Sequence, residues 1–252
     1  MIKKIGLVAS LIFITATVFG QDTKASKTES FPEISINFGT FIPAADYDEY
    51  FGTHFQIGGK FAYKTLQNTK FGLEGNFVFG NRVDSENMLK HVRTKNNEII
   101  DEDGQLATVL FFQRGFHFLA TGGKIFPKIW GQNSNSGLTA EFGLGYMQHK
   151  IRVENQNNRV PFIDGEYEKG YDRLTNGLVL KQSIGITHYS NNKLANFYVN
   201  FEMYEGFTKN RRDYNFDLDG PDKRARLDLA FGIKFGWIFL LQSRISNEYY
   251  ID

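Results

Sequence analysis

The short segment His188-Tyr189-Ser190-Asn191 brings together side chains that can carry nucleophilic chemistry. A serine hydroxyl is a weak nucleophile until an oriented base removes its proton, and histidine is the usual base. The same residues also suit a simple turn, because serine and asparagine side chains hydrogen-bond to nearby backbone there. The segment therefore supports two interpretations, a hydrolase site and an ordinary hairpin turn with an interfacial histidine.

This motif is similar to the His-x-Ser-Asn motif of the lipid A 3-O-deacylase barrels. The resemblance implies that Ser190 is the nucleophile, that His188 is its base and that Asn191 contributes to the oxyanion hole. It also implies a glutamate that orients the histidine, and Glu202 lies at a spacing that matches it. The glycine-rich stretch that follows the asparagine in that family is Asn192-Lys193-Leu194 here. The resemblance gives an alternative function, a lipid A-modifying serine hydrolase (deacylase).

A second group of candidate residues is a basic cluster near the C-terminal end of the chain. Arginine holds phosphate through two parallel hydrogen bonds, so such a cluster is a candidate for binding the phosphates of lipopolysaccharide. Aspartates in the same segment support the competing interpretation, a solvated loop of mixed charge. The candidates are Lys209, Arg211, Arg212, Lys223, Arg224 and Arg226.

Composition excludes several other kinds of chemistry. The chain has no cysteine, which excludes disulfides, thiolate metal sites, cysteine nucleophiles and a lipoprotein anchor. Its histidines are scattered without metal-ligand spacing, so we expect no metal and no cofactor. The formal net charge is only +1, which does not favour nucleic acid as a partner.

The N-terminal segment predicts export. Lys3 and Lys4 precede an apolar run from Ile5 to Phe19, and a small residue, Gly20, stands before Gln21. This pattern is typical of a secretory signal peptide cleaved after Gly20. The run is shorter than the roughly 20 residues of a membrane-spanning helix.

From Glu33 onward, apolar residues alternate with polar or small ones, as in β-strands. In the last predicted strand, apolar residues occupy every second position from Leu227 to Phe239. That length suits a tilted membrane-spanning strand, which needs roughly nine to eleven residues. Seven further segments repeat the pattern, near residues 34–42, 55–63, 71–79, 106–121, 138–146, 178–186 and 197–203.

The fourth of these segments is irregular. Phe111 and Phe112 are adjacent, and Arg114 falls in the apolar phase. We therefore expect a β-bulge near Gly115. A bulge would leave it open whether Arg114 points inward.

The connections between the predicted strands alternate between short turns and long polar segments. Short turns are expected at Leu66–Thr69 and Ser190–Lys193, and long segments at Asn81–Gln105, His149–Thr175 and Thr208–Arg224. Outer-membrane barrels have short periplasmic turns and longer external loops. The sequence thus predicts a closed antiparallel transmembrane β-barrel of about eight strands, with both termini in the periplasm.

A soluble β-sandwich is the competing fold, and the face opposite the apolar residues decides between them. That face is rich in glycine, which suits a narrow barrel interior better than a solvated sheet. An eight-stranded barrel is just wide enough for side chains to fill it, so we expect a closed lumen with paired charges. The predicted interior charges are Lys60, Glu74, Glu141, Lys181, Glu202, Asp228 and Lys234.

As a whole, the chain resembles the small eight-strand outer-membrane barrels of the OmpA/OmpX-like size class from Bacteroidota-type bacteria. The predicted organisation is a signal peptide (1–20), a disordered leader (21–32), the barrel (33–241) and a periplasmic tail (242–252). The leading functional hypothesis is a non-enzymatic structural or interaction role in the bacterial outer membrane. External loops would bind lipopolysaccharide or a partner protein, and the chain could be an accessory subunit of an envelope assembly. A narrow channel is a third possibility.

Overall fold

Eight long antiparallel strands close into a barrel in the computed structural model, which describes residues 27–84, 88–96, 98–127, 133–155, 160–190 and 194–241. Each strand pairs with the next around the ring in the order β1-β10-β9-β8-β7-β6-β3-β2, and β2 pairs again with β1. The predicted fold class and strand number are confirmed. The strands are β1 (Phe31–Ala45), β2 (His54–Lys64), β3 (Thr69–Gly80), β6 (Val109–Pro127), β7 (Gly137–Asn155), β8 (Thr175–His188), β9 (Asn196–Asn210) and β10 (Ala225–Leu240).

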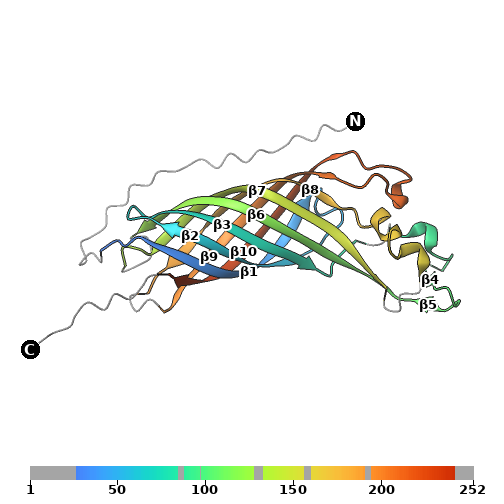
Figure 1. The fold of residues 1–252 in the computed structure, drawn as a ribbon, viewed down its shortest axis with the longest axis horizontal. Coiled ribbons are helices and arrows are strands. Elements are labelled where there is room, and N and C mark those ends of the chain that lie inside the picture. The colour runs from blue at the N-terminus through green and yellow to red at the C-terminus, as the bar shows by residue number, and fades with distance from the viewer. Residues whose placement is uncertain are drawn as a thin grey trace, which may run out of the picture.

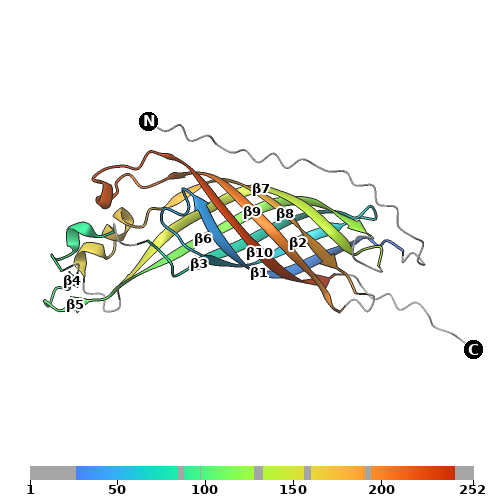
Figure 2. The same cartoon turned by 180° about the vertical axis from the view of Figure 1, so that it is seen from behind.

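The strands tilt across the long axis of the barrel, as Figures 1 and 2 show from opposite sides. Their outer face carries large apolar side chains that are widely exposed, such as Leu73 (67%), Ile42 (65%) and Phe118 (62%). A protein surrounded by water rarely exposes so extensive an apolar surface. The outer wall is therefore the lipid-facing wall of a transmembrane barrel.

Glycine fits the inner wall because the lumen is narrow. On β10, a Cβ atom added at Gly232 would lie 2.4 Å from the Phe41 ring, and one at Gly236 would lie 2.2 Å from the Tyr198 ring. Large inward side chains from one strand thus pack directly against glycine on another. The glycine-rich phase of the sequence is the inner phase of the barrel.

The bulge expected near Gly115 does not form, so that prediction is wrong. β6 keeps a continuous register with both neighbours, with Gly115 opposite Val78 on β3 and His149 on β7. Arg114 therefore stays in the outward phase, with its guanidinium carbon 5.0 Å from the centre of the Phe112 ring. A charged outward residue is tolerated there because it lies near the edge of the apolar band.

The long connections gather at one end of the barrel, which we call the loop end (Figure 1). Of the described connections between barrel strands, it holds residues 46–53, 81–84, 88–96, 98–108, 160–174 and 211–224. The opposite end, the turn end, holds the described residues 65–68, 133–136, 189–190 and 194–195. At the loop end lie two short strands and four 3₁₀ helices: β4 (Ile99–Ile100), β5 (Leu106–Ala107), Lys90–Val92, Pro161–Ile163, Tyr167–Gly170 and Phe216–Leu218.

Several strands extend beyond the segments predicted from the sequence, since β6 runs to Pro127 and β7 to Asn155. β1 begins at Phe31, inside the predicted leader, and the Glu29 N–H donates a hydrogen bond to Asn135 Oδ1 at 2.9 Å. The predicted signal peptide, residues 21–26 of the leader and the tail from 242 onward lie outside the described residues. None of the helices in the described ranges is long and apolar enough to cross a membrane.

Candidate functional site

All seven predicted lumen charges lie inside the barrel, each at least nine-tenths buried. Lys181, on β8, is at the centre of an ion-pair network. Its Nζ lies 2.5 Å from Glu74 Oε2 on β3 and 2.8 Å from Glu141 Oε1 on β7. Glu141 also pairs with Lys60 from β2. One lysine thus joins a carboxylate from the neighbouring strand β7 to one from β3, three strands away around the ring.

Lys234, on β10, extends the same network. Its Nζ lies 2.8 Å from Glu74 Oε1 and 2.9 Å from Glu202 Oε2, and it donates to the Tyr204 hydroxyl at 2.7 Å. That hydroxyl in turn donates to Glu202 at 2.8 Å. Three lysines therefore face three glutamates, and the network has no net charge. Buried ions need this kind of mutual compensation.

The seventh charge, Asp228, belongs to a separate cluster nearer the loop end. Its carboxylate lies 2.9 Å from His149 Nε2, accepts a hydrogen bond from Thr208 Oγ1 at 2.6 Å and lies 3.5 Å from Arg226 Nε. The alternation of the sequence predicted Asp228 in one network with the lysines. The structure separates it, because it lies three outward–inward repeats along β10 from Lys234.

A third charged cluster, missed by the sequence analysis, lies near the turn end. Lys70 Nζ is 2.5 Å from Glu33 Oε1, and Tyr189 donates a hydrogen bond to Glu33 Oε2 at 2.6 Å. Lys64 donates to Asn135 Oδ1 at 2.8 Å. Glu33, Lys64 and Lys70 all follow the inward phase of their strands, and that phase was the signal that identified the other charges.

An apolar plug fills the turn end around Tyr189. The Tyr189 ring packs against Phe31 edge to face, with 5.2 Å between ring centres. The plug contains five buried residues: Phe31, Ile125, Tyr189, Tyr198 and Ile238. Phe31 lies two residues from Glu33 toward the turn end and Tyr189 hydrogen-bonds to Glu33, so the plug packs against the Glu33–Lys70 pair.

At the loop end, Tyr47 and Phe51 from the connection after β1 close the mouth of the barrel. Their ring centres lie 4.8 Å and 5.3 Å from that of His149, and Gln113 donates a hydrogen bond to the Tyr47 hydroxyl at 2.7 Å. Burial, with a smaller contribution from Asp228, raises the pKa of Tyr47 above its ordinary value. Tyr47 is therefore a neutral hydrogen-bonding plug.

Between the two plugs, a cavity of about 10 Å³ is bordered by Lys60, Glu74, Glu141 and Lys181, among others. A volume of this size holds about one water molecule. Large side chains in the described lumen, such as Phe41, Tyr204 and Lys234, are at most 1% exposed. The arrangement suits a closed anchor.

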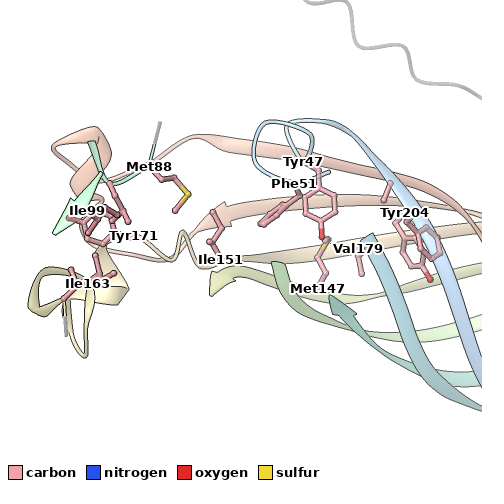
Figure 3. Close-up of a cluster of buried hydrophobic side chains, with 14 of the residues drawn as sticks. Tyr47, Phe51, Met88, Ile99, Met147, Ile151, Ile163, Tyr171, Val179 and Tyr204 are labelled. Carbon is pink, nitrogen blue, oxygen red and sulfur yellow. The ribbon is translucent and has the colours of Figure 1, made fainter. Parts of the chain in front are cut away.

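The long connections do not extend separately into solvent but fold together over the mouth. Figure 3 shows Met88, Ile99, Ile163 and Tyr171 beyond the end of the barrel. They belong to one buried cluster with Ile151 and with Tyr47 and Phe51 at the mouth of the barrel. Met88 is completely buried. We call the folded segments 46–53, 88–96, 98–108, 160–174 and 211–224 the loop cap.

Polar contacts join the segments of the loop cap to one another. Asp217 accepts a hydrogen bond from the Leu89 N–H at 2.9 Å and pairs with Arg173 at 3.3 Å. The Arg173 guanidinium also lies over the Tyr50 ring, 4.1 Å from its centre. One aspartate and one arginine thus connect all four loop-end connections.

The His188-Tyr189-Ser190-Asn191 segment lies at the turn end. His188 ends β8 and packs against Phe197, with 5.3 Å between ring centres, and the Ser190 N–H donates to Asn196 Oδ1 at 2.9 Å. Tyr189 between them points into the lumen, and Asn191 lies outside the described residues.

Glu202 does not orient His188, so that part of the carried-over triad is wrong. Glu202 lies opposite Ser183 on β8, five residues from His188, which corresponds to about 16 Å along a strand. It points into the lumen and pairs with Lys234, whereas His188 continues the outward phase of β8. The inward phase of β9 therefore commits this glutamate to the ion-pair network.

The six basic residues proposed for lipopolysaccharide divide into three groups, which are paired, buried and exposed. Arg212 forms a bidentate ion pair with Asp172, and Arg224 does so with Asp222 at 3.0 Å. Arg226 lies inside the barrel, 5% exposed, and is not available to an external ligand. The remaining three, Lys209, Arg211 and Lys223, are exposed at the loop end. Within the described ranges, no group of three His, Asp or Glu side chains is arranged to hold a metal ion.

No protein-family model matches the chain, and no curated protein matches it. Among solved structures, Neisserial surface protein A (NspA) is 8% identical, with a TM-score of 0.42, over 84% of this chain and 98% of that chain. The outer membrane protein OprG from Pseudomonas aeruginosa is 16% identical, with a TM-score of 0.37, over 86% and 99%. The attachment invasion locus protein Ail of Yersinia pestis, in complex with the heparin analogue sucrose octasulfate, is 13% identical, with a TM-score of 0.34, over 84% and 99%. The strand pairing of the chain itself gives it the eight-strand ring of the small outer-membrane barrels, the size class that its sequence resembles.

Proposed function

We propose that this protein has a structural or interaction role in a bacterial outer membrane, to which the predicted signal peptide directs it. The barrel is a sealed anchor with its loop end facing outward. The loop cap is the surface that meets other molecules, either a partner protein of the envelope or lipopolysaccharide. In this proposal the chain carries out no catalysis and needs no cofactor.

The observation that carries the proposal is that the loop cap packs onto the mouth of the barrel through Met88, Ile163 and Tyr171, while large side chains occupy the lumen. A filled lumen leaves the cap and the outer wall as the surfaces for function. The cap also exposes aromatic side chains, including Phe162 (64%), Tyr167 (59%) and Tyr214 (46%). Exposed aromatic residues on a rigid surface are typical anchors of protein interfaces.

Site-specific photo-crosslinking in cells tests the interaction role. A photoreactive phenylalanine at position 162 or 167 should give a discrete crosslinked protein species of higher mass. The same residue at position 73, in the lipid-facing band of β3, is the matched control and should give none. If positions 162 and 167 yield only the monomer, the partner-protein interaction is refuted.

Planar-bilayer recordings test the sealed lumen against the narrow-channel alternative. The purified full chain should insert without measurable steady conductance, because Tyr47 and Tyr189 close the two ends. Stable single-channel steps in the wild-type protein would overturn the sealed-anchor proposal.

The lipid A hydrolase alternative has a direct test. Mass spectra of lipid A from cells that express the wild-type protein and from cells that express Ser190→Ala should show the same acylation. Loss of an acyl chain that depends on Ser190 would restore the alternative, with a group other than Glu202 orienting the base.

A further inference from the structure

Two like charges face each other on the outer wall near the loop end. Arg114 on β6 and Lys150 on β7 are direct cross-strand partners, and both follow the outward phase. Arg152, the next outward residue on β7, lies opposite Phe112. Directly opposed side chains have Cβ atoms about 4.5–5.5 Å apart, and like charges there destabilise the sheet. Such a pair is expected where an anion binds between the two charges.

These cations lie at the edge of the apolar band. Along β6, the outward residues between Arg114 and Lys124 are Phe116, Phe118, Ala120 and Gly122, none of which is charged. The spacing from residue 114 to residue 124, at roughly 3.3 Å per residue and a tilt of about 40°, gives about 25 Å. This matches the height of the apolar band of outer-membrane barrels. Arg114 therefore lies at the depth of lipid headgroups.

Neighbouring carboxylates neutralise the two arginines only in part. Within the described ranges, Arg114 has no carboxylate at ion-pair distance, and its Nη1 donates to the Gln113 carbonyl at 2.7 Å. Arg152 lies 3.5 Å from Glu154, and its side chain is 52% exposed. Both guanidinium groups retain N–H donors for a ligand.

Lys150 is also only loosely paired. Its Nζ lies 3.9 Å from Glu168 and 3.8 Å from Asp172, beyond the distance of a good hydrogen bond. The Asp172 carboxylate is already held by the guanidinium of Arg212, with one bond of 2.8 Å. Lys150 therefore keeps donors available, and its side chain is 39% exposed.

An aromatic surface lies directly below the cations. The Phe116 ring centre is 5.6 Å from that of Phe118 and 6.0 Å from that of Tyr146, and all three residues face outward. Phe118 is 62% exposed and Tyr146 is 39% exposed. An acyl chain can lie against this surface while its headgroup meets the cations. A free phosphate ion would gain nothing from it.

We propose that Arg114, Lys150 and Arg152 bind the phosphate of a phosphorylated lipid in the outer leaflet, with its acyl chain on the Phe116–Phe118–Tyr146 surface. The site is on the wall of β6 and β7, apart from the last long connection that carries the basic residues identified from the sequence. It rests on the proposed outer-membrane location with the loop end outward. The two arginines donate charge-assisted hydrogen bonds to the phosphate oxygens, and Lys150 supplies a third positive charge.

The test is lipid binding by the purified full chain in detergent, measured by native mass spectrometry. The probes are lipid A that carries its phosphates, the same lipid A after dephosphorylation, and inorganic phosphate. Wild-type protein should retain phosphorylated lipid A and release the dephosphorylated form. Charge-assisted hydrogen bonds of ordinary strength predict that R114Q/K150Q weakens retention by at least about tenfold. K124Q, an outward lysine on β6 at the turn-end edge, is the matched control and should bind like wild type.

Three results would overturn the proposal: equal retention of the two lipid A forms, unchanged binding by R114Q/K150Q, or release of the lipid by millimolar inorganic phosphate. The first result would mean that the phosphate does not contribute to binding. The second would mean that Arg114 and Lys150 do not form the site, and the third that the site binds a free anion and not a lipid. Heat-modifiable migration in electrophoresis checks that each variant is folded, and R152Q alone serves if the double variant is not. Because binding is measured without a partner protein, a negative result here leaves the crosslinking test of the loop cap independent.

Discussion

Replacing Lys181 by methionine tests whether the lumen network holds the barrel together. Methionine is similar in length but carries no charge. The substitution removes the cation that lies 2.5 Å from Glu74 and 2.8 Å from Glu141, so it reduces the compensation of two buried carboxylates. Removing one partner of a buried ion pair costs about 3–5 kcal/mol. We expect Lys181→Met to lower the free energy of unfolding by that amount.

The assay is urea unfolding from lipid vesicles, followed by tryptophan fluorescence. Trp237 lies on the lipid-facing side of β10, 41% exposed, and reports when that strand leaves the lipid. Lys124→Met makes the same chemical change on the outer wall and is the control. It should shift the unfolding free energy by less than about 1 kcal/mol, because exposed charges contribute little.

A double-mutant cycle separates the ion pair from the loss of the side chain. Glu141→Gln in the Lys181→Met background removes a carboxylate that has lost one of its two lysines. The double variant should therefore be less destabilised than the sum of the single variants, by roughly 0.5–3 kcal/mol. Strict additivity, or a Lys181→Met variant within about 1 kcal/mol of wild type, would refute the view that paired charges hold a dry lumen together.

Three further substitutions test the two ends of the barrel. Tyr189→Phe removes the hydroxyl that donates to Glu33 at 2.6 Å, and it should lower the free energy of unfolding by roughly 1.5–3 kcal/mol in the same assay. Gly170→Ala places a methyl group 2.0 Å from the Phe216 ring, so trypsin should cleave the loop cap faster while the urea midpoint of the barrel stays unchanged. Burial opposes ionisation of Asp222, but hydrogen bonds from Arg224 outweigh it and hold the pKa of this carboxyl below its ordinary value. Such a carboxylate stabilises the fold above about pH 4 and loses that effect as pH falls through its folded pKa. In a carboxyl NMR titration, Arg224→Gln should therefore raise the Asp222 midpoint, and an unchanged midpoint would contradict this assignment.

The barrel was predictable from the sequence because the environment of its side chains, lipid or lumen, alternates with every residue along a strand. Each strand must present one face to lipid and the other to a crowded lumen, so the alternation marks both the strands and their inner charges. Lys60, Lys181 and Lys234 were identified in this way and lie in the lumen. The bulge predicted at Gly115 was wrong because a charge in the outward phase, Arg114, is accepted at the edge of the apolar band.

The loop cap and the plugs were not predictable in the same way. Met88, Ile163 and Tyr171 come from segments without periodicity, and only their three-dimensional packing makes them a core. The hydrolase resemblance fails at Glu202 for a different reason, because the alternation of the sequence already assigns this glutamate to the inner face. A motif specifies residue types along the chain, but the strand register decides which face each residue meets, and Glu202 and His188 meet opposite faces.

The inner charges also have a consequence for how this barrel selects its register. The apolar residues on its outer wall are nearly interchangeable between strands, so lipid contact alone distinguishes poorly between alternative pairings. A slip of one residue moves every side chain of a strand to the other face. Such a slip of β10 would place Lys234 against lipid, at a cost of about 2–4 kcal/mol near the middle of the bilayer. It would also leave Glu74 and Glu202 without that lysine in the lumen. The network therefore penalises a wrong register twice. An apolar core of equal volume could be as stable as the ion pairs, but it would not add this penalty.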